Sequence, residues 1–340
     1  MKIKICGLTH IKEAEYLNIN QVDLAGMVLF FPKSKRNITI DKAKEIMHHL
    51  NNNIKTVAVV VSPTIEQIRE IENAGFDYIQ IHGELSANLL KEINLPVLKA
   101  FNVTDIQKLS CYEKENKIKG YVFDAESPGS GKVFNWNILK DIPIGEKLFI
   151  LAGGLDPDNV REAVSQVKPD CIDVSSGVEF DEKSEKTGKD PKKIASFVRN
   201  ARTEIQFFDN LNNHIKNIRV KVFVEEQGFV NEFDHIDNNA RHLLCWCNGE
   251  PVGTCRIYFN EKNNTYSVGR IAVIKNYRGL SLGREILKAA EKEVARLGGK
   301  EVTLSAQERA SVFYEKQGYT KYGDVYLDEY CPHIAMKKTI

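Results

Sequence analysis

The chain lacks an excess of charge of either sign and lacks any long apolar segment. Its 340 residues include 47 lysines and arginines against 46 aspartates and glutamates, a formal net charge of +1. This balance favours neither nucleic acid nor an anionic membrane as a partner. Met1 leads directly into a short strand-like run, Lys2–Cys6, with no hydrophobic stretch behind it. We therefore expect neither a signal peptide nor a membrane span, and we expect a cytoplasmic protein.

The cysteine pattern argues against two further classes of protein. The seven cysteines do not form the framework of a small disulfide-rich domain. Cys245 and Cys247 are too close for the usual Cys-x-x-Cys ligand spacing, and no second pair complements them. We expect reduced thiols and no metal site.

The composition is that of an ordinary globular protein with room for two cores. Apolar residues make up 42% of the chain and charged residues 27%, values typical of globular domains. A length of 340 residues exceeds what one hydrophobic core usually serves. The pattern of the sequence changes near Asn200–Glu204. We place the boundary near Ala201, which gives domains 1–201 and 202–340.

In the first two hundred residues, short apolar runs alternate with helix-like amphipathic segments such as Ile40–Leu50, Thr64–Ala74 and Pro157–Val167. Eight such alternations predict an α/β fold, a small (β/α)8 TIM barrel. An open doubly wound sheet is the alternative, because counting strands does not separate the two. The apolar runs are Lys2–Cys6, Ala25–Phe30, Thr56–Val61, Tyr78–Ile81, Val97–Ala100, Tyr121–Phe123, Phe149–Ala152 and Cys171–Val174.

The second part of the chain has a different pattern. Longer runs that alternate apolar and polar residues cover Arg241–Cys247, Gly253–Asn260 and Thr265–Ile274. Such alternation is typical of antiparallel strands with one solvent-facing side. A glycine-bearing loop, a helix-like segment at Gly283–Leu297 and a final strand-helix-strand follow. This order predicts an α+β domain.

Chemically active side chains stand at the ends of the predicted barrel strands, where barrels of this kind place their active sites. A thiol and a carboxyl at one barrel mouth can act as base and acid. Glycine turns after strands seven and eight suit a phosphate group. The strand-end residues are Cys6, Arg36, His82, Asp124 and Asp173, and the turn residues are Gly153, Gly154, Ser175, Ser176 and Gly177.

Six motifs in order resemble those of phosphoribosylanthranilate isomerases. They are KICGL at 4–8, FFPKSKR at 30–36, QIHG at 80–83, Asp124 followed by Gly-Ser-Gly-Lys at 129–132, AGGL at 152–155 and DVSSGVE at 173–179. The resemblance implies an Amadori rearrangement of N-(5'-phosphoribosyl)anthranilate, a step of tryptophan biosynthesis, without metal or organic cofactor. The segment between Asp124 and Gly129 is two or three residues shorter than in many relatives.

The same resemblance assigns the site residues. It implies that Cys6 is the general base and Asp124 the general acid. Arg36 would hold the anthranilate carboxylate, a task that suits its planar fork, and Asp173 would lie near the anthranilate amine. His82 is placed in the substrate site, where orienting its neighbours is a more natural role than catalysis.

Lys4 precedes Cys6 by two residues and points to the same side of the strand. Its ammonium would lower the pKa of the thiol, which is otherwise mostly protonated at neutral pH. The alternative is a charge inside the barrel that an acidic side chain neutralises. The sequence leaves both open.

Residues 203–340 resemble the GNAT superfamily of acyl-CoA N-acyltransferases, nearest to its ElaA-like and YjcF-like branch. The resemblance implies acetyl-CoA as cosubstrate. It implies that Tyr314 protonates the departing CoA thiolate, although packing of this ring between helix and sheet is the alternative. The matching segments are 222–227, 241–244, 269–273, 277–283, 313–319 and 332–336.

The loop before the helix-like segment suits a pyrophosphate, because backbone N–H groups and a helix N-terminus converge there. In the family pattern Arg-x-x-Gly-x-Gly, Ser281 replaces the first glycine. Serine lacks the conformational freedom of glycine, but its hydroxyl can donate to a phosphate oxygen. The implied cofactor-binding residues are Ile271, Val273, Arg278, Gly279, Ser281, Gly283 and Arg284.

The general base and the acceptor amine of this second domain are not readable from the sequence. Glu225, Glu226 and His242 are candidates for the base by position. The leading hypothesis is a bifunctional isomerase and acetyltransferase. The alternatives are an isomerase with a non-catalytic, regulatory acyl-CoA-binding module, and a barrel that serves only as a scaffold for the transferase.

Overall fold

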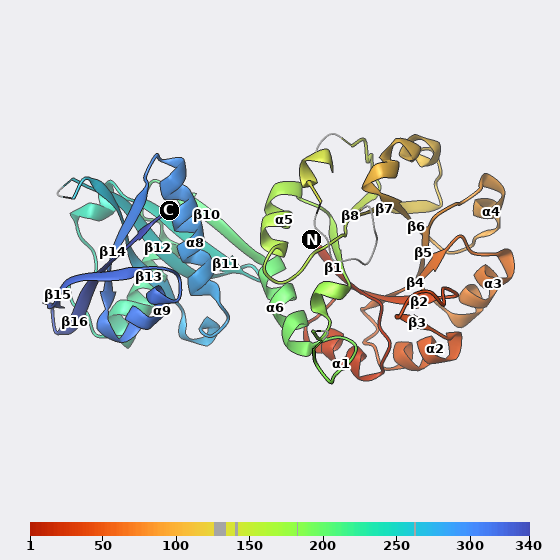
Figure 1. Cartoon of the computed structure of the whole chain (residues 1–340), viewed down its shortest axis with the longest axis horizontal. Helices are drawn as coiled ribbons and strands as arrows, with labels where there is room; N and C mark the ends of the chain where they lie inside the picture. Colours follow the sequence, from red (N-terminus) through yellow and green to blue (C-terminus); the bar gives the residue numbers. More distant parts are fainter. Residues whose placement is uncertain (126–133, 140–141, 182, 262) are drawn as a thin grey trace. The chain divides into compact units, whose positions relative to one another are not determined.

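The computed structural model describes residues 1–125, 134–139, 142–181, 183–261 and 263–340. The chain divides into two compact units, Met1–Ala201 and Arg202–Ile340 (Figure 1). Among the described residues, no helix combines the length and the apolarity needed to cross a bilayer.

The first unit is a closed barrel of parallel strands. β1 pairs with β2 on one side and with β9 on the other, so the sheet closes on itself. This closure confirms the predicted TIM barrel, since an open doubly wound sheet would leave two free edges. The two-residue strand β3 (Asn37–Ile38) lies beside β2. The barrel strands are β1 (Lys2–Cys6), β2 (Leu24–Leu29), β4 (Lys55–Val61), β5 (Tyr78–His82), β6 (Val97–Asn102), β7 (Ile118–Asp124), β8 (Leu148–Leu151) and β9 (Cys171–Val174).

Helices follow most strands and surround the barrel (Figure 1). Thr64 begins α3 with a reciprocal capping box to Gln67, and Gly75 ends it in the left-handed conformation at φ +85°. The connection from β6 to β7 is a 3-10 segment, η1 (Val103–Tyr112). The helices of this unit are α1 (Lys12–Ile19), α2 (Ile40–His48), α3 (Ile65–Ala74), α4 (Ala87–Glu92), α5 (Val160–Val167) and α6 (Pro191–Ala201).

Alternation along each strand separates two layers of side chains. In β1, Ile3 and Ile5 belong to the main core that packs strands against helices. Cys6 packs instead against the smaller cluster that contains Val57, Leu98 and Val122. The strand therefore directs Lys4 and Cys6 to the same, inner side of the barrel.

The second unit is a mixed sheet with strand order β10-β11-β12-β13-β14-β16-β15. All neighbours are antiparallel except β13 and β14, which are parallel and pair only at Tyr266 with Val302 and Ser267 with Thr303. The two strands therefore diverge beyond Ser267. The strands are β10 (Thr203–Phe208), β11 (Arg241–Cys247), β12 (Glu250–Asn260), β13 (Thr265–Val273), β14 (Glu301–Gln307), β15 (Thr320–Asp328) and β16 (Cys331–Thr339).

Helices complete this α+β unit, whose fold class agrees with the prediction. Ile286 and Val294 of the longest helix are buried in the core under the sheet. The helices are α7 (Asn213–Arg219), the π-helical η4 (Val220–Glu226), α8 (Leu282–Arg296) and α9 (Ser311–Glu315).

Candidate functional site

Lys4 and Asp173 form a buried ion pair inside the barrel. Lys4 Nζ donates to Asp173 Oδ2 at 2.8 Å, and both side chains are buried. Burial by itself lowers the pKa of Lys4, but the neighbouring carboxylate and thiol raise it overall. Lys4 thus has both contacts that the sequence left open, one to an interior carboxylate and one to Cys6.

Cys6 lies at the end of β1, with its thiol beside the Lys4 ammonium. Burial raises the pKa of the thiol, Lys4 opposes this rise, and Asp173 adds to it. The expected effect of Lys4 is therefore present but smaller than the effect of burial. Gly26 leaves space for the pair, since a Cβ there would lie 3.0 Å from both Cys6 Sγ and Lys4 Nζ.

Asp124 ends β7 and is largely shielded from solvent. Burial and the charge of Asp173 raise the pKa of Asp124 to about 6. Its Oδ1 accepts from the N–H of Ala125 at 2.8 Å. Asp173 Oδ1 is buried without a hydrogen-bond partner among the described residues, so it can accept from a ligand. The mouth thus holds a carboxyl that protonates near neutrality and an acceptor that is not satisfied.

The side chain of Arg36 lies over Gly7. A Cβ added to Gly7 would be only 2.5 Å from Cδ of Arg36. The guanidinium forms two hydrogen bonds with Glu179, Nε to Oε1 at 2.5 Å and Nη2 to Oε2 at 3.1 Å. The buried Lys189 also donates to Glu179, at 3.0 Å, and to the carbonyl of Ser175 at 3.1 Å. Arg36 is therefore held at the mouth by an acidic partner.

Sequence reasoning did not assign Glu179 or Lys189 a role. Glu179 is the last residue of the DVSSGVE motif, so its position in the motif was the available signal. Lys189 gave no comparable signal, because a lysine is usually exposed. Its backbone N–H donates to the buried Glu13 at 2.7 Å, which anchors this segment to the first turn of α1.

His82 ends β5 inside the barrel mouth. Burial and the charges of Lys4 and Lys99 lower the pKa of His82 to about 4. Its Nε2 lies 2.9 Å from Nε2 of Gln80. A neutral ring held by a neighbouring amide suits the orienting role that the sequence favoured.

The two predicted phosphate-binding turns lie after β8 and β9. Gly153 and Gly154 have φ angles of +83° and +66°, which favour glycine. A Cβ on Gly177 would lie 2.0 Å from the carbonyl oxygen of Leu155, so the two turns touch at this residue. Ser176 and Gly177 lie in the 3-10 turn η3 (Ser176–Val178), and Ser175 Oγ donates to the carbonyl of Cys6 at 2.9 Å. The Gly-Ser-Gly-Lys stretch at 129–132 lies outside the described residues.

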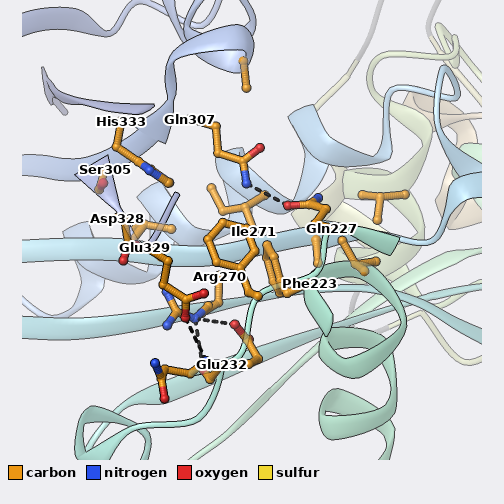
Figure 2. Close-up of a pocket in the computed structure, with 18 of the residues that line it drawn as sticks. Phe223, Gln227, Glu232, Arg270, Ile271, Ser305, Gln307, Asp328, Glu329 and His333 are labelled. Atoms are coloured by element: carbon orange, nitrogen blue, oxygen red, sulfur yellow. Dashed lines mark hydrogen bonds and ion pairs between the residues drawn. The ribbon is translucent and has the colours of Figure 1, made fainter. Parts of the chain in front are cut away.

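In the second unit, a cavity of about 210 Å³ opens where β13 and β14 diverge. The pairing of β12 with β13 shifts its register opposite Arg270, whose φ is +52°. This irregularity is a β-bulge, a feature that locally interrupts the pairing of two strands. Figure 2 shows Ile271 and Phe223 in this cavity, beside a hydrogen bond from Gln307 to Gln227. Val273 and Tyr314 also line it.

Tyr314 is a partly buried residue of the lining, and the burial of its hydroxyl raises its pKa, so the phenol keeps its proton at neutral pH. Ser281, next to the start of α8, has φ +60°, and Gly279 has φ +76°. Gly283 and Arg284 lie in the first turn of α8. The loop is therefore left-handed at both positions.

The structure does not bring the expected base candidates to this cavity. His242 is fully buried and its Nε2 lies 3.0 Å from the carbonyl oxygen of Asp237. Glu226 binds Arg278 through two hydrogen bonds of 2.6 and 2.8 Å, which occupies the guanidinium expected at the pyrophosphate. Glu225 is exposed and is not part of the lining. The titratable side chains that do line it include Glu232, Asp328, Glu329 and His333.

Within the described ranges, no group of three or more histidine, cysteine or acidic side chains is arranged to hold a metal ion.

Comparisons with known proteins match each part of the chain to a family. Residues 3–200 match the family model described as N-(5'phosphoribosyl)anthranilate (PRA) isomerase, and residues 212–340 match that of an acetyltransferase (GNAT) domain. The N-(5'-phosphoribosyl)anthranilate isomerase of Aquifex aeolicus is 41% identical over 209 residues, which cover 60% of this chain and 100% of that protein.

Solved structures match each part as well. Phosphoribosylanthranilate isomerase from Thermotoga maritima is 31% identical, with a TM-score of 0.52, over 59% of this chain and 98% of that one. Escherichia coli ElaA is 27% identical over 40% of this chain and 99% of that one, with a TM-score of 0.36.

Proposed function

Because the chain belongs to the N-(5'-phosphoribosyl)anthranilate isomerase family, we propose that Cys6 and Asp124 are the base and acid of this isomerisation in its barrel. The observation that carries the assignment is the position of both groups around the buried Lys4–Asp173 pair. A thiol beside an ammonium and a carboxyl with a raised pKa can exchange protons with one substrate held between them.

The isomerisation requires that one proton is donated to the substrate and that another is removed from it. Asp124 donates its proton to the ribose ring oxygen while the C1'–O bond breaks, and the anilino nitrogen supplies the electron pair for the Schiff base. The Cys6 thiolate takes the proton from C2', which leaves an enolamine. Tautomerisation of the enolamine gives the 1-deoxyribulose ketone. Lys4 favours the thiolate, and the unsatisfied Asp173 Oδ1 is available to the substrate nitrogen.

The remaining residues bind the two anionic ends of the substrate. Arg36 would receive the anthranilate carboxylate, since its planar fork is already held at the mouth by Glu179. The turns containing Gly153, Gly154 and Gly177 would receive the phosphate through backbone N–H groups. His82 would border the bound substrate as a neutral, orienting ring.

Two substitutions test the acid-base assignment. Cys6→Ser and Asp124→Asn each preserve size, so we expect native circular dichroism and a loss of kcat of about 10²-fold or more. Turnover within tenfold of wild type in both variants would show that other groups transfer the protons.

For the second unit we propose acetyl-CoA-dependent N-acetylation. Three observations support this: the match to the GNAT family, the cavity between the diverging strands, and the partly buried, protonated Tyr314. Tyr314 would protonate the departing CoA thiolate. The loop through Gly279 and Ser281 and the N-terminus of α8 would hold the pyrophosphate, with Arg278 released from Glu226.

An amine panel separates catalysis from binding alone. Purified full-length protein is given acetyl-CoA with a set of primary amines, and N-acetyl products are measured by mass spectrometry. If the Tyr314→Phe substitution lowers the amount of N-acetyl product at least tenfold, the result supports catalysis of acetyl transfer by this unit. Tight acetyl-CoA binding without product from any amine would favour a non-catalytic acyl-CoA-binding module.

A further inference from the structure

One end of the cavity in the second unit has a polar floor made by three neighbouring strands. Gln307 of β14 and Tyr326 of β15 are both direct partners of His333 in β16. Directly opposed residues in antiparallel strands present their side chains on the same face. Ser305 lies two residues before Gln307 on that face, and its hydroxyl bonds to that of Tyr326. Figure 2 shows Ser305, Gln307 and His333 lying close together there.

His333 is oriented as a proton acceptor. Its Nδ1 lies 2.9 Å from the carbonyl oxygen of Cys331. A carbonyl only accepts, so Nδ1 carries the hydrogen and Nε2 of the neutral ring keeps its lone pair. The residue is 6% exposed, lines the cavity, and its Nε2 has no hydrogen-bond partner among the described residues. A basic nitrogen on a nearly buried ring thus faces the space where a ligand would lie.

Two carboxylates lie next to this floor. Asp328 and Glu329 line the cavity, and neither forms an ion pair within the described part of the chain. Glu329 accepts from the backbone N–H groups of Val230 and Asn231, at 3.1 and 2.8 Å. These bonds lower the pKa of Glu329, and the charge of Arg270 lowers it further without forming an ion pair. Glu232 differs, because Arg219 and Arg270 both bind it. The negative charge without an ion-pair partner among the described residues is therefore at Asp328 and Glu329.

Aromatic rings lie beside the same end, and one of them, Phe229, lines the cavity. Tyr326 stacks on the His333 ring at 6.2 Å between centroids, and Phe229 contacts both His333 and Tyr330 at 6.5 and 5.3 Å. Ring faces attract organic cations, and adjacent carboxylates strengthen that attraction. The carboxylates and the aromatic rings together favour a positively charged ligand over a neutral or anionic one.

We propose that this end of the cavity is the acceptor site of the transferase, that it takes a primary amine carrying a second positive charge, and that His333 removes the proton from the reacting ammonium. The proposal rests on the acetyl transfer proposed above. Asp328 and Glu329 hold the second cation, and the reacting nitrogen lies at the floor formed by Ser305, Gln307 and His333.

The protons and bonds balance as follows. His333 Nε2 takes one proton from the ammonium, and the neutral nitrogen attacks the acetyl carbonyl carbon, forming the C–N bond. Collapse of the tetrahedral adduct breaks the C–S bond, and Tyr314 protonates the thiolate. The nitrogen then gives up a second proton, which restores Tyr314, and His333 returns its proton to solvent. The products are the N-acetyl amine, CoA and one proton.

Three amines with four carbons each test the substrate class: butane-1,4-diamine, butylamine and 4-aminobutanoate. Full-length protein with saturating acetyl-CoA should give the highest kcat/KM with the diamine, at least tenfold above butylamine, and the lowest with the amino acid. Equal values, or a preference for the amino acid, would overturn the proposal.

Variants test the residues in the same assay. Asp328→Asn should raise KM for the diamine at least fivefold and leave that for butylamine unchanged, whereas Asp324→Asn, on the same strand but outside the cavity, should change neither. His333→Gln should lower kcat at least thirtyfold, and imidazole added to His333→Gly should restore part of it. An undiminished kcat in His333→Gln, or no effect of Asp328→Asn on the diamine, would overturn the proposal.

Calorimetric titration with acetyl-CoA serves as the folding control, because Asp328→Asn and His333→Gln should bind it as wild type does. Binding without transfer to any of the three amines overturns this acceptor site alone. If wild type binds no acetyl-CoA, the proposed acetyl transfer falls, and the acceptor site falls with it.

Discussion

Arg36 and Glu179 form a two-point ion pair at the mouth of the barrel, although 143 residues separate them in the chain. The same carboxylate accepts from Lys189 at 3.0 Å and pairs with Lys35 at 3.0 Å. Burial alone would raise the pKa of Glu179, but the surrounding cations lower it to about 2. One acid thus positions the arginine expected at the substrate carboxylate, and it neutralises a buried lysine.

Glu179→Gln keeps the shape and the acceptor oxygen but removes the charge. We expect KM for phosphoribosylanthranilate to rise about tenfold with little change in kcat, because Arg36 loses its orientation, and we expect a loss of stability on the order of 2 kcal/mol. Since the pKa of Glu179 is depressed in the folded state, its contribution is complete above the ordinary value of 4.5 and is lost as pH falls towards 2.

Urea unfolding of both proteins between pH 2 and 8 measures this difference. The two curves should converge in acid. The exposed Glu185→Gln is the matched control and should follow wild type throughout. Equal stability at neutral pH would mean that the ion pair contributes nothing.

The pH dependence of the isomerase follows from its acid and its base. Catalysis needs protonated Asp124, with a pKa of about 6, together with ionised Cys6, whose pKa burial raises. Below pH 6 the rate rises as the thiolate fraction grows. Between the two pKa values the gain in thiolate cancels the loss of carboxylic acid, and above the pKa of Cys6 the rate falls.

We therefore expect kcat/KM to rise with pH up to about 6 and then to form a plateau. Steady-state assays from pH 4.5 to 10 check this shape. In Lys4→Met the thiol loses its ammonium neighbour, so the plateau should be lower and extend to higher pH. A rate that rises steadily through pH 6 without a plateau would contradict the assignment of Asp124.

Ser281 has φ +60°, in the left-handed region that favours glycine. Ser281→Gly should relieve strain on the order of 1 kcal/mol but remove a hydroxyl that can bond to phosphate. Because these effects nearly cancel, we expect the affinity for acetyl-CoA to change by less than about tenfold, or about 1.4 kcal/mol. Calorimetry on both proteins measures it. A wild type that binds nothing, with binding restored by the glycine, would indicate a domain that has lost its cofactor.

The division at Ala201 and Arg202 predicts that each unit folds on its own. A fragment ending at Arg202 contains the whole closed barrel and every proposed isomerase residue. It should be monodisperse and have kcat and KM within threefold of the full chain. An aggregated fragment would show that the barrel depends on the second unit for its stability.

The sequence predicted much of both folds and both families. Strand-end motifs and the alternation of strands with helices led to the isomerase barrel, and the family models and the closed sheet confirm it. The same holds for the acetyltransferase domain. Local patterns sufficed here because strand periodicity, glycine turns and strand-end side chains are properties of short segments.

Tertiary structure decided what those residues touch. Lys4 reaches Asp173 across 169 residues because β1 and β9 pair and close the barrel. His333, rather than His242, faces the cavity because β14 and β16 pair while β13 diverges from β14. The closure of the barrel, the register of the paired strands and the divergence of β13 from β14 bring together residues that are far apart in the chain. Burial then shifts the pKa values of those residues. No local pattern encodes those distances, so the partners of the proposed catalytic residues emerged only from the folded chain.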